Sequence, residues 1–128
     1  MRNSENQLEC GLNGGSNEQR VDGTTNLDGE WHHVACVFDA SSREIKVFVD
    51  GDVDDCKILD VGIDVSRIGS TSLGAGALGA IDSVHAYAQA LTAADICKSA
   101  GRGTSCSSIC PIDRGGQGGG SGSGDDGF

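Results

Sequence analysis

Six cysteines in a chain of 128 residues limit what this sequence can fold into more than any other feature. So many thiols in so short a chain are typical of an oxidising compartment, where cysteines pair as disulfides. Eight of the 21 glycines lie in the last fourteen residues, which predicts a flexible tail or linker over 115–128. Residues 1–114 are then left for one domain with a small core, and disulfides are expected to contribute to its stability.

The charge balance excludes several classes of partner. Nine basic and 19 acidic side chains give a formal net charge of −10, whereas nucleic acids and anionic membrane surfaces are bound by basic patches. No apolar run approaches the ~20 residues of a membrane helix, and the first seven residues hold no hydrophobic segment of a signal peptide. We therefore expect no nucleic acid, no membrane insertion, and a mature or excised piece of a secreted, extracellular protein.

The clearest local signal is a β-hairpin in the middle of the chain. The apolar run Trp31–Phe38 predicts one strand, and the alternating pattern of Glu44–Val49 predicts the next. Asp50 and Gly51 follow directly, and this pair is typical of a two-residue hairpin turn in which both residues have positive φ.

Weaker patterns predict further strands and one helix. Thr92 with Asp95 three residues later forms a capping-box pattern, so a helix of about two turns is expected over 91–98, with Gly101 as its stop. The expected additional strands cover residues 7–12, the vicinity of 19–21, 56–61, 65–69 and 80–88. The chain therefore reads as an antiparallel all-β protein with one short C-terminal helix.

Two stretches resemble a known family. Gly29–Ala35 (GEWHHVA) followed by Ile45–Gly51 (IKVFVDG) looks like the signature of laminin-G-like domains, more narrowly of concanavalin A-like jelly rolls in secreted proteins. Ile68–Ser70 (IGS), Gly79–Tyr87 (GAIDSVHAY) and Ala90–Ile96 (ALTAADI) follow in the family's order, so the resemblance covers about 27–98.

The resemblance implies an antiparallel jelly-roll β-sandwich, complete or incomplete. Such sandwiches run to roughly 200 residues, and only 30 residues precede Trp31, where the family has its opening strands. Either the chain forms a shortened, self-contained sandwich, or it is a fragment or is completed by a partner. An incomplete sheet would leave open edges and an uncovered apolar face, which proteins avoid.

The sequence argues against catalysis. Retaining glycosidases need two carboxyl groups ~5–5.5 Å apart, and the corresponding strand of glucanases with this fold would be Ile81–His85, which holds Asp82 alone. His32 and His33 are adjacent on an expected strand, so they point to opposite faces and cannot chelate one metal ion. No nucleophile elbow, phosphate loop or zinc-protease motif occurs. We expect a protein that is not an enzyme.

The candidate binding residues are few. Laminin-G-like domains often hold calcium at the sandwich rim, and the resemblance implies Asp82 as a weak candidate for a calcium ligand. The alternative is that Asp82 is a hydrogen-bonded strand residue or lies in a solvated turn. Calcium is thus the one expected cofactor. The acidic group from Asp50 to Asp55 is expected to be a soluble hairpin end. The resemblance places Trp31 mostly in the core, and no sugar-binding residues can be assigned.

The cysteines are expected to pair as three disulfides. Cys97, Cys106 and Cys110 lack a fourth ligand for a zinc site, so we expect Cys97 to bond Cys106 or Cys110 and pin the coil after the helix. The family order makes Cys10 and Cys36 neighbours and a second pair. Cys56 then takes the remaining C-terminal cysteine, among fifteen possible pairings of six cysteines.

These observations favour a non-catalytic extracellular recognition or adhesion module that binds glycan or an extracellular protein. The alternative is a self-assembling structural subunit of an extracellular filament, completed by strand exchange when the N-terminal strand joins a neighbour's open sheet. A monomer that is stabilised by calcium or sugar would support the module. Large assemblies that depend on concentration would support the subunit, a homo-oligomer or polymer.

Overall fold

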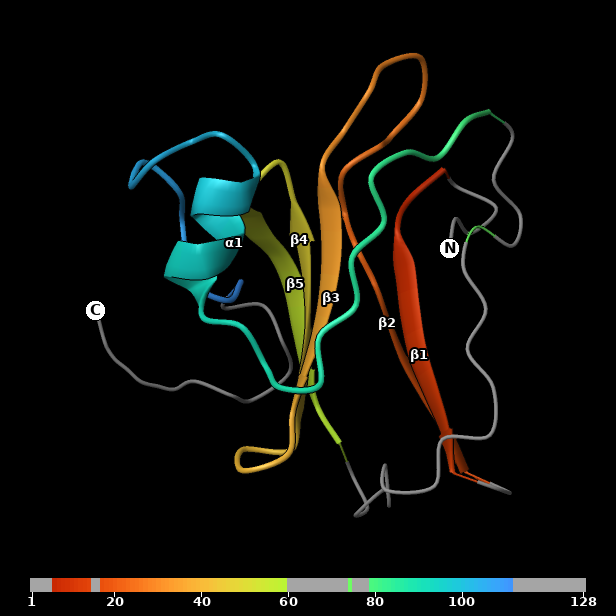
Figure 1. The fold of residues 1–128 in the computed structure, drawn as a ribbon. Helices are drawn as coiled ribbons and strands as arrows, with labels where there is room; N and C mark the ends of the chain where they lie inside the picture. The colour runs from red at the N-terminus through yellow and green to blue at the C-terminus, as the bar shows by residue number, and fades with distance from the viewer. Residues whose placement is uncertain (1–5, 15–16, 60–73, 75–78, 112–128) are drawn as a thin grey trace.

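Five strands and one helix make up the described part of the protein. The structure, a computed structural model, describes residues 6–14, 17–59, 74 and 79–111. The chain order is β1 (Glu9–Gly14), β2 (Asn17–Asp22), β3 (Val34–Asp39), β4 (Glu44–Val49), β5 (Asp52–Ile58) and α1 (Ala93–Ser99). β1 and β2 form an antiparallel pair, and β3, β4 and β5 form a second antiparallel sheet in that order (Figure 1). The predicted class, an antiparallel all-β protein with one short helix, is confirmed.

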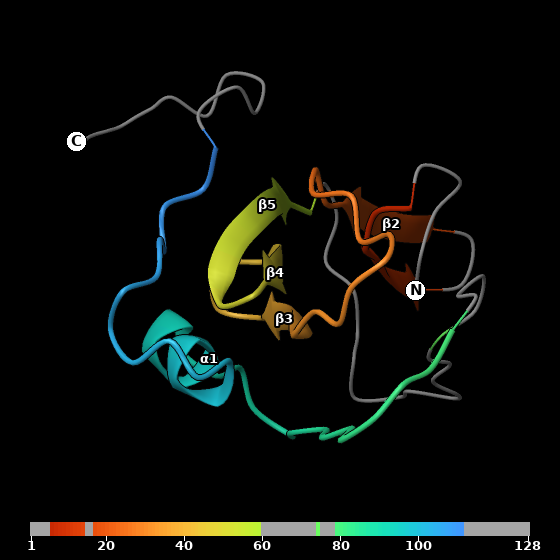
Figure 2. The ribbon, with the colours of Figure 1, turned by 90° about the horizontal axis from the view of Figure 1, so that it is seen from above.

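The three-stranded sheet lies between the β1–β2 pair and helix α1 (Figure 2). Successive side chains of the central strand β4 point to opposite faces of the sheet, so β4 contributes apolar residues to both. Ile45 and Val47 pack toward β1 and β2, while Phe48 packs toward α1. On the first side lie the buried residues Leu8, Cys10, Val21, Ile45, Val47 and Leu59. On the second side lie Phe48, Val53, Cys56 and Ile96. The core is thus two small apolar layers, one on each face of the three-stranded sheet.

The predicted turn between β4 and β5 is confirmed, but the adjoining strands have different bounds. Asp50 and Gly51 have φ values of 53° and 90°, as a two-residue hairpin turn requires. β5 therefore starts at Asp52, directly after the turn, and not at Cys56. β3 starts at Val34, three residues later than predicted, which leaves Trp31 in the loop before the strand.

Asp54 joins the two sheets at a β-bulge. The pairing of β4 with β5 shifts register between Val47 and Phe48, so Asp54 has no pairing partner on β4. Its carboxylate accepts hydrogen bonds from the backbone N–H groups of Thr24 (2.6 Å) and Thr25 (3.0 Å) and from both hydroxyls (3.2 and 2.6 Å). The loop after β2 is therefore anchored on β5.

The helix is capped as its sequence predicts. The Thr92 hydroxyl accepts from the backbone N–H of Asp95, and the Asp95 carboxylate accepts from that of Thr92, which completes the capping box. The helix ends at Ser99, and Gly101 two residues later has a φ of 78°. No helix in the described ranges is long and apolar enough to cross a membrane.

The three disulfides pair the cysteines in the way expected from the sequence. Cys10 on β1 bonds Cys36 on β3, Cys56 on β5 bonds Cys110, and Cys97 on α1 bonds Cys106. The first bond links the β1–β2 pair to the larger sheet. The other two hold the coil after α1 against the helix and β5.

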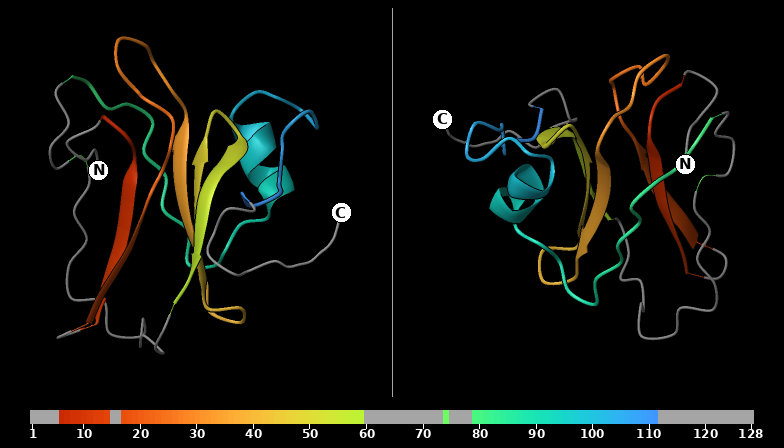
Figure 3. Two further views of the ribbon diagram at one scale, coloured as in Figure 1. Left: turned by 180° about the vertical axis from the view of Figure 1, so that it is seen from behind. Right: turned by 45° about the horizontal axis from the view of Figure 1, so that its top comes forward.

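The predicted strand over 80–88 is wrong. Residues 79–91, named here the crossing segment, are irregular, and no backbone hydrogen bond joins them to another described residue. The segment passes β3 on its way to α1 (Figure 3). Ile81, Val84 and Tyr87 recur every third residue and so do not give the alternation that a half-buried strand needs. The strand predicted over 65–69 and the tail over 115–128 lie outside the described residues.

Candidate functional site

The carboxylate of Asp50 fixes the loop before β3 to the turn between β4 and β5. Its Oδ2 lies 2.8 Å from His32 Nδ1, and its Oδ1 accepts the backbone N–H of His33 at 3.0 Å. In return, the backbone N–H of Asp50 donates to the His33 carbonyl at 2.7 Å. These contacts give both histidines a structural role, but they lie in the loop before β3 and not on the strand where the sequence placed them.

Arg102 attaches the C-terminal loop to the same turn. Its Nη1 donates to the Asp50 carbonyl at 2.8 Å and lies 3.4 Å from Asp52 Oδ2. Asp52 Oδ1 accepts the backbone N–H of Ser107 at 2.7 Å, and the Ser107 carbonyl accepts that of Val53 at 2.9 Å. The acidic hairpin end is therefore hydrogen-bonded to the loop before β3 on one side and to the C-terminal loop on the other. The sequence analysis expected a soluble hairpin end and did not predict these contacts.

The network holds three chain segments at one end of the sheet. We call it the turn end, made of His32, His33, Asp50, Asp52 and Arg102. Sequence reasoning did not single out Arg102, although it is the only basic residue between Lys98 and Arg114 in a coil of small polar residues.

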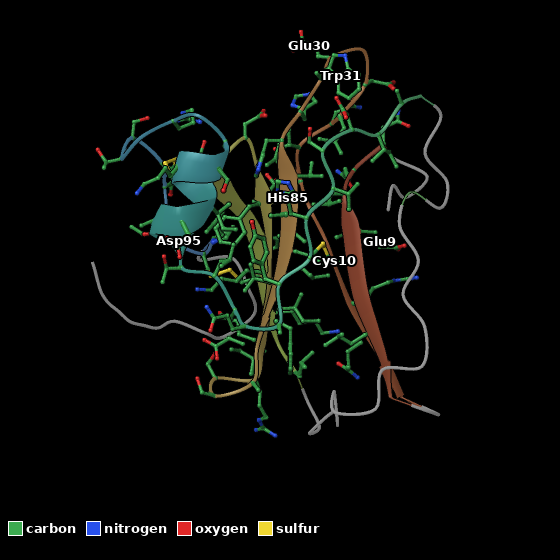
Figure 4. All side chains as sticks on the ribbon, in the orientation of Figure 1. Glu9, Cys10, Glu30, Trp31, His85 and Asp95 are labelled. Carbon is green, nitrogen blue, oxygen red and sulfur yellow. A yellow bond between two sulfur atoms is a disulfide. The ribbon has the colours of Figure 1, made fainter. Side chains whose placement is uncertain are left out.

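Trp31 is exposed at the tip of the loop that the turn end supports, so its predicted place in the core is wrong. Its side chain is 71% accessible, and Figure 4 shows it beside Glu30 beyond the end of β3. β3 starts only at Val34, so Trp31 lies beyond the end of the sheet, where no strand among the described residues packs against it. An exposed indole ring on a loop that is fixed by hydrogen bonds offers a flat surface on which the apolar face of a ligand can pack.

The pKa of Asp50 is lowered from its ordinary value of 3.8. Partial burial acts to raise the pKa, but the hydrogen bonds from the His32 ring and the His33 backbone stabilise the charged form and outweigh it. A lowered folded pKa means that the ionised group contributes stability above its unfolded pKa, and that this contribution is lost as the pH falls through the folded pKa.

The substitution Asp50→Asn is therefore expected to destabilise the protein at neutral pH and to matter less in acid. Asparagine tolerates the left-handed turn conformation, so the change removes the charge and leaves the turn. Urea unfolding of both proteins between about pH 5 and pH 2 measures the difference, which should shrink as the pH falls. A difference that stays constant over this range would show that the Asp50 charge has no part in it.

Among the described residues, no ligand set surrounds Asp82, the weak calcium candidate. Asp82 is exposed in the crossing segment and belongs to no group of three potential metal ligands among the described residues. One group of three potential ligands does occur among the described residues, made of Glu44, Cys56 and Cys110, and Asp82 is not part of it. Its two sulfurs form a disulfide and are therefore not thiolate ligands. Calcium at Asp82 stays a prediction.

The crossing segment also holds His85 and Tyr87, whose rings meet edge to face. Their centroids are 6.4 Å apart at 86°, and both side chains are exposed. Because the segment is not a strand, Asp82 and His85 do not project from a regular sheet as the active-site strand of a glucanase would require.

The comparison with protein-family models agrees with this fold. A laminin G family model, described as the concanavalin A-like lectin/glucanases superfamily, matches residues 1–97. The match also covers residues 1–26, which precede the stretch of about 27–98 where the sequence resembles the family. Among curated proteins there is no significant match.

The comparison with solved structures gives one match. It is the crystal structure of an S-layer domain-containing protein from Clostridium thermocellum, with 18% sequence identity and a TM-score of 0.44. The alignment covers 73% of this chain and 51% of that one, so the chain spans about half the length of that structure.

Proposed function

This chain belongs to the concanavalin A-like lectin/glucanases superfamily, and from that premise we propose that it is a non-catalytic extracellular module that binds glycan at the loop carrying Trp31. The single observation that carries the proposal is the 71% exposure of this indole on a loop fixed by Asp50. Sugar rings present apolar C–H faces that pack on aromatic rings. Because the loop that carries the indole is already fixed, less conformational freedom of the backbone is lost on binding.

The charge of the chain selects the class of glycan. With a net charge of −10, the surface repels sulfated and uronic sugars and favours neutral ones. The carboxylate of Glu30, exposed beside Trp31, offers acceptors for sugar hydroxyls. Neutral oligosaccharides are therefore the expected ligands.

Two features support the rest of the proposal. Three disulfides among the described residues favour an oxidising, extracellular location. A non-catalytic role is favoured because Asp82, which stands where glucanases of this fold carry a catalytic strand, lies in irregular backbone and not on a strand.

The fluorescence of Trp31 tests the proposal directly, since the chain has one tryptophan. Titration with neutral oligosaccharides should shift the emission in a saturable way. Trp31→Ala should weaken binding about tenfold by calorimetry, while Tyr87→Ala, which removes an exposed aromatic ring from the crossing segment, should leave it unchanged. Titrations with calcium and with a chelator test the predicted ion in the same experiment.

An unchanged emission for every neutral glycan, or equal losses in the two variants, would contradict the glycan site. Binding of acidic glycans alone would contradict the argument from charge. Saturable binding that survives in Trp31→Ala would place the site elsewhere on the domain.

The filament subunit remains the alternative. Its expected donor, the N-terminal strand β1, pairs with β2 over six residues of each strand and is bonded to β3 through Cys10 and Cys36. Exchange of β1 would therefore have to break both the pairing and the disulfide. This observation favours the recognition module.

A further inference from the structure

The crossing segment is the stretch of the described chain that the fold holds least. Every residue from 79 to 90 is exposed, and no backbone hydrogen bond joins these residues to another described residue. None of them belongs to either apolar layer of the core. Exposed stretches of small and polar residues are preferred sites of proteolytic cleavage, because a peptidase has to bind the backbone on both sides of the bond that it cuts.

Tyr87 gives this stretch a side chain that a peptidase can recognise. The ring is exposed, and the residues on either side of it, Ala86 and Ala88, are small. Peptidases of the chymotrypsin class hold an aromatic side chain in an apolar pocket and cut the bond that follows it. The bond between Tyr87 and Ala88 therefore combines a matching side chain with backbone that is free to bind.

The other aromatic residues lack this combination. Phe38 and Phe48 are paired within the three-stranded sheet, and Phe128 is the last residue of the chain. Trp31 is exposed, but both backbone groups of His33, two residues later, are hydrogen-bonded to the turn after β4. A peptidase could bind there only after these bonds break, and cleavage slows as the free energy of such opening rises.

The disulfides would keep the two pieces together after a cut at this bond. One disulfide lies within residues 1–87 and another within 88–128. The third, between Cys56 on β5 and Cys110, joins the two pieces covalently. Helix α1 also packs on the sheet through its own buried side chains. The core and the covalent link are therefore both independent of the crossing segment, whose course past β3 is seen in Figure 3.

We propose that the crossing segment is a processing site for an endopeptidase of the chymotrypsin class, and that the bond it cuts is Tyr87–Ala88. Hydrolysis consumes one water, so that the Tyr87 carbonyl becomes a carboxylate and the Ala88 nitrogen becomes an ammonium group. In an oxidising environment the disulfide between Cys56 and Cys110 persists. The product is a folded protein of two chains, residues 1–87 and 88–128.

Digestion of the folded protein with chymotrypsin tests the proposal. The first cut should fall after Tyr87, and the product should have the mass of the whole chain plus one water. Reduction under denaturing conditions should then release residues 1–87 and 88–128, which mass spectrometry identifies. Tyr87→Ala should slow the first cut by at least about tenfold, because the remaining aromatic residues lie in bonded backbone.

Two tyrosines placed elsewhere in the Tyr87→Ala background separate the effect of the backbone from that of the side chain. Val84→Tyr returns a ring to the crossing segment, at a position that is 59% exposed, and should restore a fast cut after residue 84. Ile109→Tyr is the matched control, because residue 109 is 75% exposed but follows Ser107, whose N–H and C=O are both bonded to β5. This variant should be cut at least about tenfold more slowly than Val84→Tyr.

Four results would overturn the proposal. A first cut after Trp31, or equal rates for Val84→Tyr and Ile109→Tyr, would show that exposure of the side chain alone selects the bond. A chain that stays intact would show that the crossing segment is not accessible to a peptidase, and pieces that separate before reduction would show that no disulfide joins them. Trp31 and the turn end lie outside the crossing segment, so glycan binding and cleavage can fail independently.

Discussion

Replacing Cys56 and Cys110 together by alanine is expected to lower the free energy of unfolding by about 4 kcal/mol. Their bond closes a loop with a sequence separation of 54, the longest of the three disulfides, and the chain-entropy cost of an open loop grows with its length. Cys56 is also 1% exposed and packs with Phe48 and Ile96, so the missing sulfur adds a small cavity.

The matched control is the double alanine variant of Cys97 and Cys106. This bond spans a separation of 9, so the same argument gives a smaller loss of about 2–3 kcal/mol. Urea unfolding with the other two disulfides intact measures both variants. Equal losses, or a larger loss for the short loop, would contradict loop entropy as the main contribution of these bonds.

The central hairpin could be predicted because its signals are local. The alternation in Glu44–Val49 selects the two faces of β4, and Asp50 with Gly51 selects the turn. The helix is predictable for the same reason, since Thr92 and Asp95 satisfy each other's backbone within one turn. In such segments, the residues that determine the structure are also neighbours in the sequence.

The errors arise where structure depends on a distant partner. Trp31 and Val34 belong to one apolar run, and nothing in that run shows that the strand starts only at Val34. Residues 80–88 have the composition of a strand, but a strand also needs an edge to pair with, and this segment has to cross the β3 edge to reach α1. Composition alone carries no information on either point.

The candidate site was predictable only in part. His32 and Asp50 are separated by 18 residues, but the hairpin brings them together, so their contact follows from a correct strand pairing. Arg102 and Asp52 are 50 residues apart and meet only because the disulfides fold the C-terminal loop back onto β5. The cysteines can be read from the sequence, but which of them pair determines where the C-terminal loop lies. The contact between Arg102 and Asp52 therefore depends on the disulfide pairing.

Gly51→Ala is expected to destabilise the protein by roughly 2–5 kcal/mol, for two reasons. Gly51 has a φ of 90°, and an L side chain in that region is strained by about 1–2 kcal/mol. In addition, a Cβ at this position would lie 2.7 Å from Cys106 Sγ and 3.2 Å from the Ala100 Cβ. Relieving such overpacking costs about 1–3 kcal/mol, because the disulfide to Cys97 prevents Cys106 from moving away.

Gly101→Ala separates the two contributions. Gly101 has a similar φ of 78°, but a Cβ there would meet nothing within 4 Å, so this variant carries the conformational strain alone. Urea unfolding should therefore show Gly51→Ala to be the more destabilising of the two. In a background where Cys97 and Cys106 are both alanine, the contact with Sγ is gone and most of the excess should disappear, since the contact with the Ala100 Cβ at 3.2 Å is the looser of the two. If the excess persists in that background, the close approach of the turn to the disulfide is not its cause, and the contact with Ala100 would account for it.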